Sequence, residues 1–88
     1  IIMNFKNLSF IQHPNINNAI MAQVICNNGK RVSVVAGKGM YSTSKAGVKE
    51  ECNKVEEAVS FEVMVGDEGV IGWQTREDID KILKENNG

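Results

Sequence analysis

The clearest hydrophobic pattern in the chain lies near its end. An apolar run, Val70-Ile71-Gly72-Trp73, leads into Thr75, and apolar side chains then recur at helical spacing at Ile79, Ile82 and Leu83. Asp78 follows Thr75 by three residues, a spacing typical of a helix N-terminus at which two side chains cap each other's backbone amides. The pattern predicts a strand over residues 70–73 and an amphipathic helix over 76–85, with residues 86–88 as a fraying end.

Two other segments, residues 20–26 and 30–36, are rich in β-branched and apolar residues and predict an antiparallel hairpin. Asn27-Asn28-Gly29 separates them, and Asn and Gly both tolerate the positive φ that tight hairpin turns require. Because side chains alternate along a strand, Val32 and Val34 should share one face, with Arg31, Ser33 and Val35 on the other.

The remaining segments give weaker signals. Residues 4–11 alternate loosely and predict a first strand, which His13-Pro14-Asn15 ends because proline fixes φ. Regular alternation near the end of residues 55–65 predicts another strand, followed by a turn at 66–69. Residues 41–53 fit a short helix and an irregular loop equally well.

Together these elements predict an α+β fold. We expect a single small domain over residues 1–88, with a twisted antiparallel sheet of four or five strands and the C-terminal amphipathic helix packed on one face. Trp73 should then pack beneath that helix against Ile79 and Ile82, and the methionines should fill the core. Met3 is a candidate native start, which would make Ile1 and Ile2 a cloning addition.

Composition and charge narrow the class of protein. Apolar residues make up 42% and charged residues 24%, as in a soluble globular domain. No membrane-spanning run or signal peptide is visible, so we expect a cytoplasmic protein. The net charge is −1, with an excess of basic residues before position 55 and of acidic residues after it, and we expect these halves to interleave. A chain this close to neutral argues against nucleic-acid binding.

The sequence offers little catalytic chemistry. His13 is the one histidine, and beside a proline it fits a turn residue that hydrogen-bonds the backbone better than a catalytic base. Cys26 and Cys52 form at most one disulfide, and Cys26, within an apolar run, fits a small core residue. Two distant cysteines and one histidine do not make a zinc site. We therefore expect no enzyme, no catalytic or metal-binding residues and no cofactor.

Two groups of residues are candidates for binding. The first is a glycine turn followed by hydroxyls and a lysine, whose amides could cradle a phosphate or nucleotide: Gly37, Lys38, Gly39, Ser42, Thr43 and Lys45. Its spacing is not that of a P-loop, and an ordinary glycine-rich loop explains it as well. The second group comprises aromatic and basic residues suited to an interface with a host protein or with a second copy in a homodimer: Tyr41, Trp73, Lys30 and Arg31.

Five short motifs occur in an order that resembles a family of small proteins encoded by phages and prophages. They are His13-Pro14-Asn15 after Phe10, Asn28-Gly29 before Ser33-Val34-Val35, the aromatic Tyr41, Phe61-Glu62-Val63-Met64-Val65, and Val70 through Ile79. Residues 42–54 do not align with the pattern, and the turn at 66–69 is shorter than usual. The resemblance implies an accessory protein of the bacterial host cytoplasm that binds a host macromolecule, with inhibition of a defence system as the expected role. A phosphate- or nucleotide-sequestering protein and a virion or assembly component are the alternatives.

Overall fold

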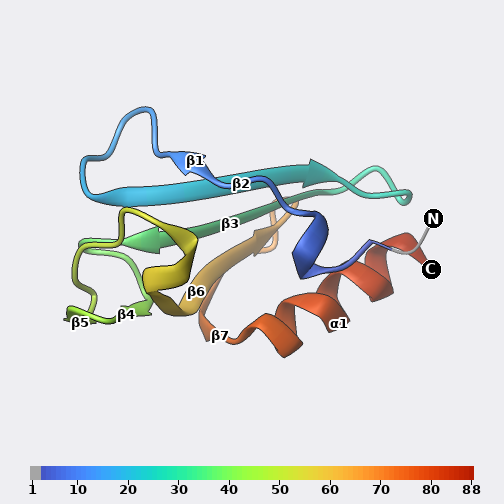
Figure 1. The fold of residues 1–88 in the computed structure, drawn as a ribbon. Coiled ribbons are helices and arrows are strands. Elements are labelled where there is room, and N and C mark those ends of the chain that lie inside the picture. The colour runs from blue at the N-terminus through green and yellow to red at the C-terminus, as the bar shows by residue number, and fades with distance from the viewer. Residues whose placement is uncertain (1–2) are drawn as a thin grey trace.

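The computed structural model describes residues 3–88, so the expectation about Ile1 and Ile2 lies outside the described residues. In chain order the elements are the 3₁₀ helix η1 (Phe5–Asn7), β1 (Ile11–Gln12), β2 (Ala19–Ile25), β3 (Arg31–Gly37), β4 (Thr43–Ser44), β5 (Gly47–Val48), the 3₁₀ helix η2 (Val55–Glu57), β6 (Ala58–Val65), β7 (Val70–Gln74) and α1 (Arg76–Asn87) (Figure 1). The α+β prediction is confirmed. The strand count over these residues is seven, above the predicted four or five, because three of the strands are only two residues long.

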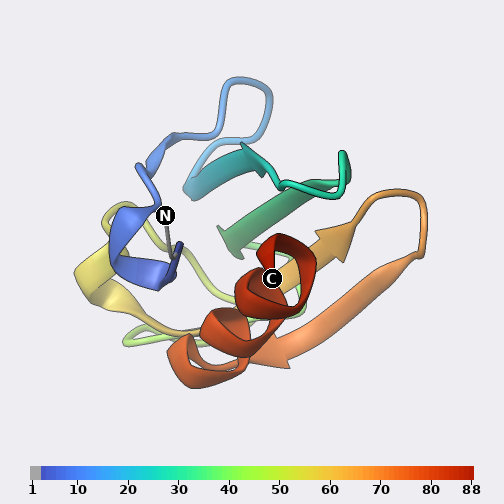
Figure 2. The ribbon, with the colours of Figure 1, turned by 90° about the vertical axis from the view of Figure 1, so that its right-hand side faces the viewer.

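The sheet is antiparallel throughout. Strands β1, β2, β3 and β6 lie side by side in that order, and β7 pairs with the other edge of β6. The short β4–β5 hairpin pairs with the first half of β6. Helix α1 lies on one side of the sheet, with η1 beside it (Figure 2). We call the opposite side, which no helix of residues 3–88 covers, the open face.

The hairpin of β2 and β3 confirms the second prediction. Cys26 donates its amide to the Lys30 carbonyl at 2.8 Å, and the amide of Gly29 donates to the Cys26 carbonyl at 2.9 Å. Of the three loop residues only Gly29 has a positive φ, +86°, so the turn is the three-residue type that places glycine at its left-handed position. Val32 and Val34 are fully buried as predicted.

The core fills the space between the sheet and α1. Its fully buried large side chains include Phe61, Val63, Ile79 and Leu83, and both cysteines are free thiols within it. Cys26 is thus the small core residue that its context predicts. Burial raises the pKa of the Cys52 thiol, so this sulfur stays protonated at neutral pH.

Two segments differ from their predictions. Of residues 4–11 only Ile11 lies in a strand, β1: Asn4 caps η1, and the amide of Phe5 donates to the Asp80 carboxylate on α1 at 2.6 Å. This contact turns the Phe5 ring into the core, where it packs against Phe61 with ring centroids 5.2 Å apart. The segment 41–53 is neither helix nor plain loop, because β4 and β5 form a small hairpin there.

Helix α1 begins at the capping box that the sequence predicts. The Thr75 hydroxyl accepts from the Asp78 amide at 3.1 Å, and the Asp78 carboxylate accepts from the Thr75 amide at 3.0 Å. These hydrogen bonds from Thr75 hold the pKa of Asp78 below its ordinary value, because they favour the charged form.

The lowered pKa of Asp78 predicts a pH-dependent contribution to stability. A depressed folded-state pKa stabilises the fold above the unfolded value of about 3.9, and this stabilisation disappears as pH falls through the lower folded value. Wild type should therefore be more stable to urea than Asp78→Asn at pH 7, and this difference should shrink as the pH falls below the unfolded value. A difference that stays the same size through this acidic range would contradict the assignment.

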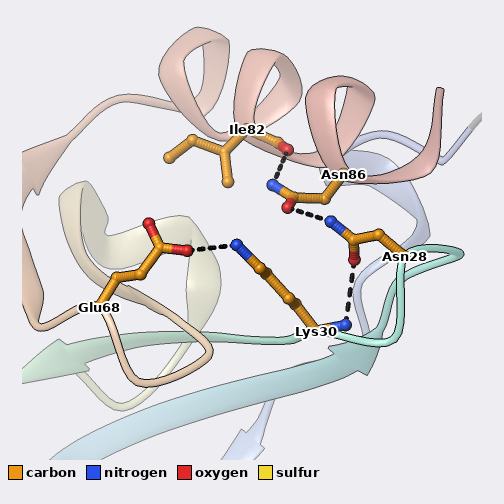
Figure 3. A network of polar contacts seen from close by, with 5 residues as sticks. All are labelled: Asn28, Lys30, Glu68, Ile82 and Asn86. Carbon is orange, nitrogen blue, oxygen red and sulfur yellow. Dashed lines mark hydrogen bonds and ion pairs between the residues drawn. The ribbon is translucent and has the colours of Figure 1, made fainter.

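The C-terminal end of α1 is fixed by hydrogen bonds, whereas the sequence predicted a fraying end. The helix continues to Asn87, beyond the predicted end at residue 85. Asn86 receives a hydrogen bond from the Asn28 side-chain amide at 2.7 Å and donates its own amide to the Ile82 carbonyl at 2.8 Å (Figure 3). Asn87 accepts from the Asn27 backbone amide at 2.8 Å. The helix end is thereby tied to the β2–β3 loop.

Candidate functional site

The backbone amides of the glycine-rich loop between β3 and β4 already donate hydrogen bonds within the protein. The Gly37 amide donates to the buried Ser42 hydroxyl at 3.1 Å, the Lys38 amide to the Asn18 carbonyl at 3.3 Å, and the Gly39 amide to the Lys49 carbonyl at 2.8 Å. The next residues continue this pattern, with partners for the amides of Met40, Tyr41, Ser42, Thr43, Lys45 and Ala46. A phosphate cradle needs amides that point outward without a partner, and these amides are all engaged.

The lysine of this loop also lies in a setting that does not favour an anion. Lys45 lines a hollow of about 380 Å³ together with Glu51 and Glu57. Two carboxylates against one ammonium give this hollow a negative balance, which repels phosphate. Phosphate or nucleotide capture at the loop stays a prediction, now resting on the side chains of Lys38 and Lys45 alone.

The four interface residues named from the sequence divide into three places. Lys30 points to the helix side of the molecule, where its ammonium lies 2.6 Å from the Glu68 carboxylate (Figure 3). Arg31, the next residue, points to the open face because side chains alternate along a strand. Tyr41 and Trp73, by contrast, lie together, with ring centroids 5.4 Å apart.

Trp73 is not beneath the helix, so that prediction is wrong. It is 48% exposed and lies against Tyr41, which is 47% exposed. The cause is a register shift in the pairing of β6 with β7, where one extra residue is inserted between the partners of Phe61 and Val63. A bulge of this kind turns the next side chain to the other face of the sheet.

The backbone around Trp73 is strained. Trp73 has a φ of +51° and Lys49 a φ of +60°, a region that L-residues with large side chains rarely occupy. The Lys49 ammonium lies 5.2 Å from the centre of the Tyr41 ring, and the Trp73 amide donates to the Tyr41 carbonyl at 2.9 Å. We call Tyr41, Lys49 and Trp73 the aromatic corner. Strain of about 1–3 kcal/mol per residue is commonly concentrated at functional sites.

Gly72 allows the aromatic corner to close. A Cβ atom at Gly72 would lie 2.9 Å from the Tyr41 Cβ, closer than side chains approach one another. The absence of a side chain at this position lets Tyr41 lie directly against β7. The corner is therefore built from three distant segments: the loop after β3, the turn after β5, and β7.

A second feature of the open face is a groove along β2, β3 and β6, which sequence reasoning missed. Its volume is about 450 Å³, and it is lined by His13, Met21, Gln23, Arg31, Ser33, Val35, Glu62, Met64, Gly66 and Asp67. Met64 is 40% exposed and Met21 is partly exposed, so these two methionines do not fill the core as predicted, although Met40 does. The alternation in β3 is the sequence signal that could have indicated this surface.

The groups with potential catalytic chemistry do not meet. The Nδ1 atom of His13 accepts from the Asn15 amide at 3.1 Å, the local turn contact that its position beside proline predicts. His13 lines the groove on the open face, whereas both thiols are buried in the core on the other side of the sheet. Within residues 3–88 no cluster of three or more His, Cys, Asp or Glu side chains is placed to hold a metal ion.

Comparison of the chain with family models, curated proteins and solved structures finds no match. No helix in the described part of the chain is long and apolar enough to cross a membrane. The aromatic corner and the groove are the two surfaces of the described residues with the clearest potential for binding.

Proposed function

We propose that this chain is a non-enzymatic binding protein that docks on another protein through the aromatic corner. The observation that supports this most strongly is the pair of half-exposed rings, Tyr41 and Trp73, held together by a backbone with positive φ at Trp73. The resemblance to phage and prophage proteins supports a partner in the bacterial host cytoplasm and a role in blocking a defence protein.

The aromatic corner is better suited to stabilising a complex with another protein than to stabilising the fold. Tyr and Trp dominate the residues that lose the most affinity when truncated at protein interfaces. Rings already fixed against one another lose little rotamer freedom on binding, so more of the contact energy appears as affinity. Lys49 adds a positive charge beside the Tyr41 ring, which favours a partner with a carboxylate at this position.

Affinity capture from bacterial lysate with matched variants tests this proposal. A protein retained by wild type should bind at least about tenfold more weakly to Trp73→Ala and Tyr41→Ala, because hot-spot truncations cost about 2 kcal/mol or more. Val59→Ala is the control, since Val59 is also half-exposed, at 55%, and lies on β6 outside the aromatic corner. Equal affinity of wild type and Trp73→Ala for the captured protein would contradict the proposal.

Trp73→Gly separates binding from folding. Glycine adopts a φ of +51° without strain, so this variant should be more stable than Trp73→Ala by about 1 kcal/mol in urea unfolding. It should nevertheless lose binding as fully as Trp73→Ala. A stable Trp73→Gly that still binds would show that the indole is not part of the interface.

A further inference from the structure

The groove on the open face carries charges of opposite sign that fit a second copy of the same chain. We propose that two copies pack open face to open face about a two-fold axis, with Arg31 of each copy against Glu62 of the other. Neither Tyr41 nor Trp73 lines this groove, so the inference does not depend on the proposed function of the aromatic corner.

The two charges that carry the proposal come from residues on neighbouring strands. Arg31 is exposed at the start of β3, and its guanidinium makes no hydrogen bond or ion pair within residues 3–88. Glu62 on β6 is partly exposed; one of its carboxylate oxygens accepts from the Tyr41 amide at 3.1 Å. Both residues line the groove. Arg31 and Glu62 are not paired with each other, and Asp67, in the turn after β6, is a second carboxylate of the groove.

The register of the strands sets the position of the axis. Ser33 pairs with Met64 and Val35 pairs with Glu62. Arg31 and Glu62 are thus about 13 Å apart along the strands and about 5 Å apart across them. The point midway between them is the Ser33–Met64 pair. A two-fold axis that passes above this pair, parallel to the sheet and perpendicular to the line from Arg31 to Glu62, places Arg31 over the partner's Glu62 and Glu62 over the partner's Arg31.

Several apolar side chains lie around the axis, together with the polar side chains of Ser33 and Gln23. Residues opposite one another on paired strands share a face, so Met64, Val70, Met21 and Ile11 all lie on the open face. Ile11 is 60% and Val70 46% exposed, and Ile25, paired with Arg31, is 58% exposed. Met64, at the axis, meets its own copy, and its flexible side chain adapts to such a self-contact.

The area that a stable dimer interface buries fits within one face of the molecule. A stable interface buries about 800 Å² on each partner. The exposed surface of the chain is 5397 Å², so a dimer needs about one-seventh of it. A partner of one charge sign, such as a nucleic acid, would leave either Arg31 or Glu62 facing a like charge, whereas a second copy satisfies both.

Light scattering after size exclusion, with sedimentation equilibrium, tests the inference. Wild type should give twice the 9.7 kDa chain mass, with a dissociation constant below about 100 μM. Arg31→Glu and Glu62→Arg should each weaken the dimer at least about tenfold, because each places like charges together twice. An equimolar mixture of these two variants should recover the dimer, since both cross-pairs are then of opposite sign. Lys54→Glu, a charge reversal outside the groove, should leave the dimer unchanged.

Met64→Lys provides an independent variant if a charge reversal disturbs folding. It places two ammonium groups at the axis and should give a folded monomer, with unfolding in urea as the check on the fold. A wild-type chain that remains at 9.7 kDa up to about 0.5 mM overturns the proposal and leaves the groove to a different protein. Folded single variants that dimerise as wild type does, or a mixture that stays monomeric, overturn it as well.

Discussion

Replacement of Phe61 by alanine is expected to lower the free energy of unfolding by about 3–5 kcal/mol, since truncation of a buried aromatic leaves a large cavity. Phe61 is fully buried at the centre of β6. Its ring lies 5.2 Å from the Phe5 ring and 5.6 Å from the Phe10 ring, so it joins the N-terminal segment to the sheet. For a domain of this size, such a loss is a large fraction of the total stability.

Arg76 makes the site of Phe61 harder to repack. Its guanidinium lies 5.2 Å from the centres of both the Phe61 and Phe5 rings and donates to the carbonyls of Val55 and Ala58 at 3.0 Å. Truncation of Phe61 would leave a cavity beside the Arg76 guanidinium and remove its contact with the Phe61 ring.

Urea unfolding measures the effect of Phe61→Ala. Val59→Ala on the same strand is the matched control: Val59 is 55% exposed and does not line the groove, so its truncation should cost less than about 1 kcal/mol. Phe61→Leu, which refills much of the volume, should fall between the two. An unchanged midpoint for Phe61→Ala would mean that Phe61 is not in the core.

The parts of the fold that the sequence predicted are those in which one local rule acts without interruption. In β3 the more exposed and the buried positions alternate from Arg31 to Ala36, and Val32 and Val34 are buried as this alternation requires. At the start of α1 the spacing of Thr75 and Asp78 is sufficient to define the cap, because both partners lie within one turn.

The parts that the sequence could not predict depend on distant contacts or on a single inserted residue. Strict alternation along β7 places Trp73 on the same side as Ile71, beneath the helix, and the bulge reverses this. The end of α1 is ordered by Asn27 and Asn28, about sixty residues earlier in the chain. No local pattern records a pairing of this kind.

The candidate sites show the same division. Tyr41 and Trp73 could be named as interface residues from their types alone, but their contact requires the strained backbone and the missing side chain of Gly72. The glycine-rich loop was named from its composition, and hydrogen bonds to Asn18 and Lys49 then account for its amides. Composition identifies residues with the right chemistry, whereas their availability is decided by the tertiary contacts.

Replacement of Gly37 by alanine is the second large effect we expect, and it tests why glycine occupies this loop. A Cβ atom at Gly37 would lie 2.4 Å from the Ala19 Cβ, 2.5 Å from the Ala19 Cα and 2.7 Å from the Asn18 carbonyl oxygen. Two of these three atoms belong to the backbone of the segment that opens β2 and cannot move without breaking its pairing with β3. We expect Gly37→Ala to cost about 3 kcal/mol or more in urea unfolding.

Gly39→Ala is the matched control for Gly37→Ala, two residues along the same loop. A Cβ atom at Gly39 meets nothing within 4 Å, and the cost comes only from its φ of +80°. That conformational penalty is about 1–2 kcal/mol, smaller than the clash at Gly37. If the loop instead evolved to hold an anion, the two glycines should be equivalent for folding, and phosphate should stabilise wild type more than either variant. A clearly larger loss for Gly37→Ala, insensitive to phosphate, identifies the glycine as the point at which the end of β3 lies close against its partner at the start of β2.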